Sequence, residues 1–76
     1  MEEKVKKIMS DVFLVDINEI NNYTSPDNLP QWDSIGHLNL ITSLEEEFNI
    51  KFNDDQIIQM LNFKLVIEII KESLHQ

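Results

Sequence analysis

Three residues with reactive or ionisable side chains stand close together near the middle of the chain: Asp33, Ser34 and His37. Turn-forming residues precede them, and apolar residues at intervals of three and four follow them, which is typical of an amphipathic helix. Ser34 therefore lies at or next to a helix start. There the first backbone N–H groups lack partners and the helix dipole is positive, so a phosphate esterified to the Ser34 hydroxyl would be electrostatically stabilised.

The same residues allow two other interpretations. Serine is among the commonest helix N-caps, a role that contributes roughly 1 kcal/mol and involves no chemistry. Asp33, Ser34 and His37 also have the residue types of an orienting acid, a nucleophile and a base. Such a triad needs desolvated, convergent geometry and an oxyanion hole, and a helix start on a small bundle leaves all three side chains in water. We therefore expect His37 to be an exposed polar residue, and we predict no catalytic residue.

The surrounding sequence is more specific than the position of the serine. The attachment segment of acyl carrier proteins closely resembles two stretches of this chain, Leu29–Leu38 (LPQWDSIGHL) and Leu44–Phe48 (LEEEF). In that family an Asp-Ser-Leu/Ile motif opens the second helix, and its serine bears 4'-phosphopantetheine. The resemblance implies that Ser34 is the attachment point, that Asp33 is the motif residue before it, and that phosphopantetheine is a covalent cofactor.

Length and cysteine content narrow the class of protein. A chain of 76 residues is expected to form one domain, 1–76, which is too small to hold both a hydrophobic core and a deep substrate cleft. On size we therefore do not expect an enzyme, and the resemblance implies a carrier instead. The chain contains no cysteine, so any thiol chemistry must come from an added group. It shows neither a signal-peptide pattern nor an apolar stretch long enough for membrane insertion, and we expect a cytoplasmic monomer.

Charge indicates the kind of partner. The net charge is −8, with 14 acidic and 6 basic residues, which argues against binding to nucleic acid or to an anionic membrane surface. No Lys or Arg occurs between Ile8 and Ile50, so the middle of the chain carries one sign of charge. Partner proteins are expected to present basic docking surfaces. For the scattered acidic residues, solubility is the simpler explanation.

Four residues are candidates for partner binding. Glu45, Glu46 and Glu47 fall near the C-terminal end of the predicted second helix, where negative charge opposes the dipole at a cost of a few tenths of a kcal/mol each. This favours a recognition role over a chance solvated face. Ile35 lies outside the apolar spacing of that helix, so we expect it to be exposed beside the attachment point, as its counterpart is in carrier proteins that dock on enzymes. The acidic residues lack the spacing of an EF-hand, and no metal site is predicted.

Hydrophobic spacing predicts an all-α fold, a small four-helix bundle with a long first loop and a short third helix. The resemblance implies that this bundle is of acyl-carrier-protein type. We expect helices over Glu2–Leu14, Ser34–Phe48 and Asp54–Met60, and a fourth that is capped by Asn62. The residues expected to form the core are Val5, Ile8, Met9, Val12, Phe13, Leu38, Ile41, Leu44, Phe48, Phe63, Val66, Ile67, Ile70 and Leu74.

The long loop, Val15–Asp33, lacks helical periodicity and is rich in Asn, Asp, Ser and Pro. Asp16 and Glu19 have the spacing of a capping box around one short turn, and Asn53 and Gln56 repeat it before the third helix. Four apolar residues are expected to pin the loop across the bundle: Ile17, Ile20, Tyr23 and Leu29. Trp32 is expected to cover the edge of the core.

The resemblance also predicts the function. Ser34 is expected to be modified by a phosphopantetheinyl transferase, and the thiol of the arm to hold acyl or aminoacyl groups as thioesters for loading and processing enzymes. The chain departs from the fatty-acid-synthesis members of the family at Gly36, His37, Asn39 and Thr42. These departures favour a dedicated carrier of specialised biosynthesis or a D-alanyl carrier of cell-wall modification, and the sequence does not choose between them. The alternative is a small acidic adaptor that binds a basic protein partner, with Ser34 only a helix cap.

Overall fold

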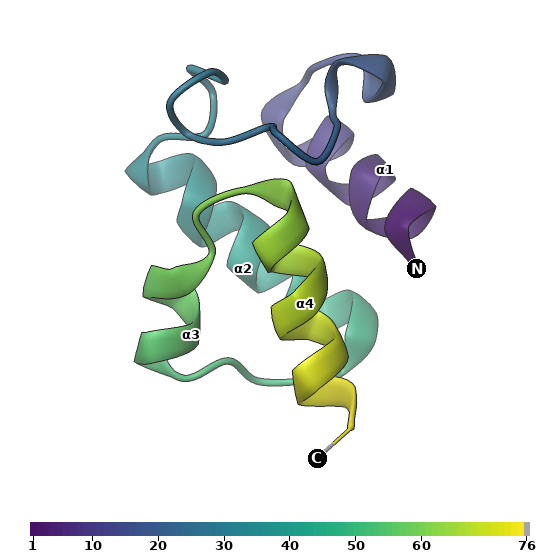
Figure 1. Ribbon diagram of the computed structural model, residues 1–76, viewed down its shortest axis with the longest axis vertical. Helices are drawn as coiled ribbons and strands as arrows, with labels where there is room; N and C mark the ends of the chain where they lie inside the picture. Colours follow the sequence, from purple (N-terminus) through teal and green to yellow (C-terminus); the bar gives the residue numbers. More distant parts are fainter. Residues whose placement is uncertain (76) are drawn as a thin grey trace.

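The computed structural model describes residues 1–75, and these residues fold into four α-helices and one short 3₁₀ helix. The elements are α1 (Glu2–Phe13), η1 (Ile17–Glu19), α2 (Ser34–Phe48), α3 (Asp54–Gln59) and α4 (Phe63–Leu74). In Figure 1 the loop between α1 and α2 crosses one end of the bundle, α4 lies in front of α2, and α3 lies to one side. The described residues contain no strand, and the predicted all-α bundle with a long first loop and a short third helix is confirmed.

Side chains from α1, α2 and α4 and from the segments that connect the helices fill the core. Because burying one large aliphatic or aromatic side chain contributes about 1.5–3 kcal/mol, this cluster is the main source of stability. Its members are Val5, Met9, Phe13, Ile20, Leu29, Trp32, Leu40, Ile41, Leu44, Phe52, Met60, Phe63, Val66, Ile67, Ile69 and Ile70.

Side-chain caps start most of these elements, at the positions that the sequence predicts. Asp16 and Glu19 form a capping box around η1, and Asn53 and Gln56 form another around α3. The side chain of Asn62 accepts a hydrogen bond of 2.8 Å from the Leu65 amide at the start of α4. Each cap satisfies a backbone N–H that has no partner within its own helix.

The loop is fixed to the bundle by apolar and polar contacts. Ile20 and Leu29 are buried, as predicted, and the amide of Phe63 at the start of α4 donates a 2.8 Å hydrogen bond to the carbonyl of Thr24. The prediction that Tyr23 pins the loop is wrong, because its side chain is 84% exposed. The backbone is held at this place because the Thr24 hydroxyl accepts from the Asn21 amide and the Asn28 side chain donates to the Tyr23 carbonyl.

Two predicted core positions, and the predicted end of the first helix, differ in the structure. Leu38 is 60% exposed, and Leu40 is buried beside Ile41 and Leu44 instead. Residues 40, 41 and 44 share one face of α2, whereas residue 38 lies more than a quarter turn away from the centre of that face. Leu74 in the last turn of α4 is exposed, and Ile69 is buried. The first helix ends at Phe13, one residue before the predicted end, because Leu14 adopts a left-handed conformation with φ of 57°.

Candidate functional site

Ser34 is the first residue of α2, and its side chain is exposed. The N-cap is the preceding residue, Asp33, whose carboxylate accepts a 2.7 Å hydrogen bond from the Gly36 amide. The first intrahelical bond runs from the His37 amide to the Asp33 carbonyl, so the amides of Ser34 and Ile35 precede the helical hydrogen-bond pattern. Ser34 therefore has no capping function, and its hydroxyl projects from a helix start whose dipole favours an anionic group.

Trp32 and His37 connect the loop to two helices beside Ser34. The indole of Trp32 is 1% exposed, and its Nε1–H donates a 2.8 Å hydrogen bond to Nδ1 of His37. The other ring nitrogen of His37, Nε2, lies 2.9 Å from the carbonyl oxygen of Ile57 in α3. The indole also stacks on Phe13, with 5.6 Å between the ring centroids. Trp32 thus lies in the core itself and does not merely cover its edge.

The expectation that His37 is a free, exposed side chain is wrong. It is half-buried, and both ring nitrogens are engaged, one with Trp32 and the other with Ile57. A histidine in this state has no lone pair available to accept a proton from the Ser34 hydroxyl. The geometry therefore gives no support to a catalytic triad at this site.

Gly36 allows the loop to approach the first turn of α2 closely. A β-carbon at this position would clash with the backbone carbonyl oxygen of Gln31 and would lie 3.1 Å from Cε1 of Phe13. A backbone carbonyl cannot turn away as the end of a flexible side chain can. The absence of a side chain at residue 36 thus brings Gln31, and with it the Trp32 indole, against the helix that carries Ser34.

An apolar pocket of about 390 Å³, with Ser34 among its lining residues, lies between the loop, α2 and α3. Its walls are formed by Pro26, Trp32, Asp33, Ser34, His37, Ile57, Ile58, Met60 and Leu61. This pocket could not be predicted from the sequence, because its two sides come from segments at least twenty positions apart. The only hint of the pocket was the presence of Ile58 and Leu61, two apolar residues that have no place in the core and are exposed on and just after α3.

Apolar side chains also surround the outer rim of the site. Ile35 is 72% exposed, as predicted, next to Ser34 on α2. Leu38, one turn further along the same helix, is exposed as well, and so are Ile58 and Leu61 on the α3 side of the pocket. The start of α2 therefore presents apolar surface on the outside of the bundle, close to the candidate attachment point.

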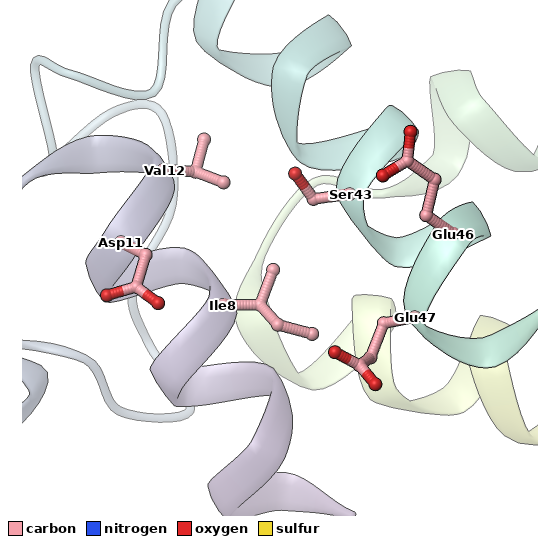
Figure 2. Close-up of a pocket in the computed structure, with 6 residues that line it drawn as sticks. All are labelled: Ile8, Asp11, Val12, Ser43, Glu46 and Glu47. Atoms are coloured by element: carbon pink, nitrogen blue, oxygen red, sulfur yellow. The ribbon is translucent and has the colours of Figure 1, made fainter.

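The three clustered glutamates of α2 have different surroundings. The carboxylate of Glu45 is largely buried and accepts a 2.9 Å hydrogen bond from the Phe52 amide, with Lys51 Nζ at 3.9 Å. Glu47 pairs with Lys4 of α1 at 3.3 Å. Glu46 is exposed, and it lines with Glu47 a groove of about 350 Å³ between α1 and α2. Figure 2 shows Ile8 and Asp11 on the α1 side of this groove, opposite Ser43, Glu46 and Glu47.

Neither a metal site nor a membrane-spanning helix is found in the structure of residues 1–75. No three His, Cys, Asp or Glu side chains of this part of the chain come together as metal ligands would. None of the helices in it is long and apolar enough to cross a membrane.

Comparison with known proteins identifies the family. No protein-family model matches the sequence. The chain is 30% identical over 73 residues to an acyl carrier protein of Coprothermobacter proteolyticus, covering 96% of this chain and 89% of that protein. It is 34% identical over 70 residues to an acyl carrier protein of Nitratidesulfovibrio vulgaris, covering 92% of each.

A solved structure shows the same fold. The solution NMR structure of holo acyl carrier protein from Geobacter metallireducens superimposes with a TM-score of 0.87 at 28% sequence identity, covering 97% of this chain and 85% of that one. The sequence matches and the structural match each cover more than nine-tenths of this chain, so they include all four helices and the long loop. The chain belongs to the acyl carrier protein family.

Proposed function

We propose that this carrier holds acyl or aminoacyl groups as thioesters on a 4'-phosphopantetheine arm attached to Ser34. The observation that carries the proposal is the position of Ser34: an exposed residue at the start of α2, directly after the Asp33 cap, that lines an apolar pocket. The thiol of the arm supplies the chemistry, and the protein supplies attachment, positioning and recognition.

The residues around Ser34 fit such a group. The free amides at the start of α2 and the helix dipole favour the negative phosphodiester that attachment creates. Asp33 fixes the first turn through its bond to the Gly36 amide, which holds the Ser34 hydroxyl in place for a phosphopantetheinyl transferase. The mainly apolar pocket next to Ser34 suits the hydrocarbon part of an acyl group, since burying apolar surface there removes it from water.

We propose that partner enzymes dock on α2 through Ile35 and the acidic residues Glu45, Glu46 and Glu47. Ile35 offers exposed apolar area beside the arm, and the acidic residues attract basic docking surfaces. Among the three acids, Glu46 is the one whose exposed carboxylate has the fewest internal contacts, because Glu45 holds the Phe52 amide and Glu47 pairs with Lys4. We expect Glu46 to contribute most to docking.

We further propose a pathway other than housekeeping fatty-acid synthesis. Members of the family that serve that pathway usually carry acids in the turn after the serine, whereas this chain has Gly36 and His37 there. Both departures are part of the packing: a side chain at residue 36 would strike the Gln31 carbonyl, and His37 bridges Trp32 and Ile57. Specialised biosynthesis and D-alanyl transfer both remain compatible with this arrangement.

Intact mass spectrometry tests the attachment. Incubation with coenzyme A and a broad-specificity phosphopantetheinyl transferase is expected to add one phosphopantetheine to the wild-type chain and none to Ser34→Ala. Ser43→Ala is the matched control, because Ser43 lies on the same helix at the groove between α1 and α2. A wild-type chain that stays unmodified across several transferases, with its helix content verified, would leave the acidic adaptor as the better explanation.

A further inference from the structure

We propose that His37 is a positioning residue that holds α3 in place over the pocket beside Ser34 and so determines how well the pocket shelters an acyl group on the arm. This inference rests on the proposed function, since it concerns cargo carried from Ser34. It starts from the two contacts of one imidazole ring, to Trp32 in the loop and to Ile57 in α3. All three residues line the pocket.

The donors and acceptors define the state of the ring. Indole Nε1–H is only a donor, so Nδ1 of His37 must accept from Trp32. The ring proton is then on Nε2, which donates to the carbonyl of Ile57 at 2.9 Å. The bridge is therefore directional, from the buried indole through the imidazole to α3. The other neutral tautomer, with its proton on Nδ1, would lose both bonds.

The third helix depends on contacts of this kind. It spans only Asp54–Gln59, and a helix of six residues is far too short to be stable alone. Its amide-to-carbonyl bond at the C-terminal end, from Met60 to Ile57, is long at 3.4 Å, so the His37 ring supplies a better donor to the same carbonyl. The other side-chain bond from α3 to a helix, from Gln56 Nε2 to Ser73 Oγ at 3.2 Å, lies on the face toward α4.

A fixed α3 gives the pocket preformed walls. Ile57 and Ile58 belong to α3, and Met60 and Leu61 follow it directly, so the position of α3 sets one whole side of the pocket. If the bridge is lost, an entering acyl group must order these residues itself, and part of its binding free energy is consumed. The pocket then shelters the acyl group less well, although attachment to Ser34 is unchanged.

Two substitutions at His37 each remove one of the two bonds that the ring makes, to Trp32 and to Ile57. In His37→Asn the side-chain oxygen occupies the place of Nδ1 and can still accept from Trp32, but the residue does not reach Ile57. In His37→Gln the side-chain nitrogen occupies the place of Nε2 and can still donate to Ile57, but the acceptor for Trp32 is lost. Asn39→Ala, an exposed change on the same helix, is the matched control.

The experiment compares two cargoes in each variant. The chain is loaded at Ser34 from acetyl-coenzyme A or octanoyl-coenzyme A by a broad-specificity transferase, and cleavage of each thioester by hydroxylamine is followed by intact mass. In the wild type we expect the octanoyl thioester to be cleaved more slowly than the acetyl thioester. In His37→Asn this protection should fall by about three- to tenfold, the factor associated with one net hydrogen bond, and His37→Gln should retain more of it. Asn39→Ala should match the wild type.

The outcomes separate the two proposals. A wild-type chain that takes up no arm would contradict the proposed function. A chain that is loaded normally but shows equal protection in wild type and His37→Asn would overturn the role of His37 alone. If the variants lose their helix content, wild-type NMR decides: the single tryptophan gives one indole N–H signal, which should shift with octanoyl and not with acetyl cargo. An indole N–H chemical shift that is the same with octanoyl and with acetyl cargo would also overturn the inference.

Discussion

The indole nitrogen of Trp32 lies 2.8 Å from Nδ1 of His37, and this bond joins the long loop to the helix that carries Ser34. Five positions along the chain separate the two residues, and the helix start at Ser34 lies between them. The segment around the proposed attachment point is thus closed on itself by one hydrogen bond between side chains. Its geometry depends on buried packing as well as on the cap at Asp33.

Trp32→Phe tests the energetic weight of this bond. The substitution keeps an aromatic ring against Phe13 but removes the donor and leaves His37 Nδ1 without its partner. We expect the free energy of unfolding to fall by about 1–3 kcal/mol, measured by urea denaturation followed by circular dichroism. Tyr23→Phe, at an exposed aromatic residue of the same loop, should change it by less than about 0.5 kcal/mol. Equal effects at both positions would contradict the structural role of the bond.

Gly36→Ala tests the close approach of the loop. Alanine is favoured over glycine inside a helix by about 1 kcal/mol, so a free position would gain stability. Here the added methyl group meets the Gln31 carbonyl and Phe13, and overpacking of this kind costs about 1–3 kcal/mol. We expect a net loss in the free energy of unfolding, measured against Asn39→Ala on the same helix. A gain at residue 36 would show that the loop can move away without cost.

Asp33→Ala and Ser34→Ala distinguish the cap from the attachment point. Because the Asp33 carboxylate, and not the Ser34 hydroxyl, accepts from the Gly36 amide, Asp33→Ala should lose about 0.5–2 kcal/mol of stability. Ser34→Ala should stay within about 0.5 kcal/mol of wild type. Thermal unfolding monitored at the helical signal compares the two. A larger loss at Ser34 would mean that its hydroxyl has a structural role.

Glu46→Lys tests the docking surface. Reversing an exposed charge should slow modification by a phosphopantetheinyl transferase at low salt, because steering acts mainly on association, and the difference should shrink as salt is added. Glu68→Lys on the exposed face of α4 reverses a charge on another helix and serves as the control. Equal modification rates for the two variants would mean that Glu46 is only a solvent-exposed charge with no role in docking. Glu45 is unsuited to this test, since its carboxylate also holds the Phe52 amide.

Local signals allowed most of the fold to be predicted. The caps at Asp16, Asn53 and Asn62 and the start of α2 depend on neighbours within three residues, so sequence spacing is sufficient to find them. Leu38 was misplaced because Leu38 and Leu40 are both apolar, and tertiary packing into the core selects which of them faces inward. The spacing of three from Leu38 to Ile41 is helical but does not by itself identify the buried face.

The site was predictable only in part. Ser34, Asp33 and Ile35 could be proposed from the sequence because they follow one another in a recognisable segment. The role of His37 was missed because its partners, a buried indole and a backbone carbonyl of α3, are brought together by the tertiary fold. The spacing of five residues between the only tryptophan and His37 could have suggested a contact between them. The backbone carbonyl of residue 57 could not be predicted as a partner, because every residue has a carbonyl group.

The most direct test of the carrier function is to locate the modification within the chain. After incubation with coenzyme A and a transferase, the wild-type protein is cleaved at acidic residues, and the modified peptide is fragmented in the mass spectrometer. We predict that the added phosphopantetheine is found on the Ser34 hydroxyl alone. Modification of another serine, or a folded wild-type chain that takes up no phosphopantetheine, would contradict the account.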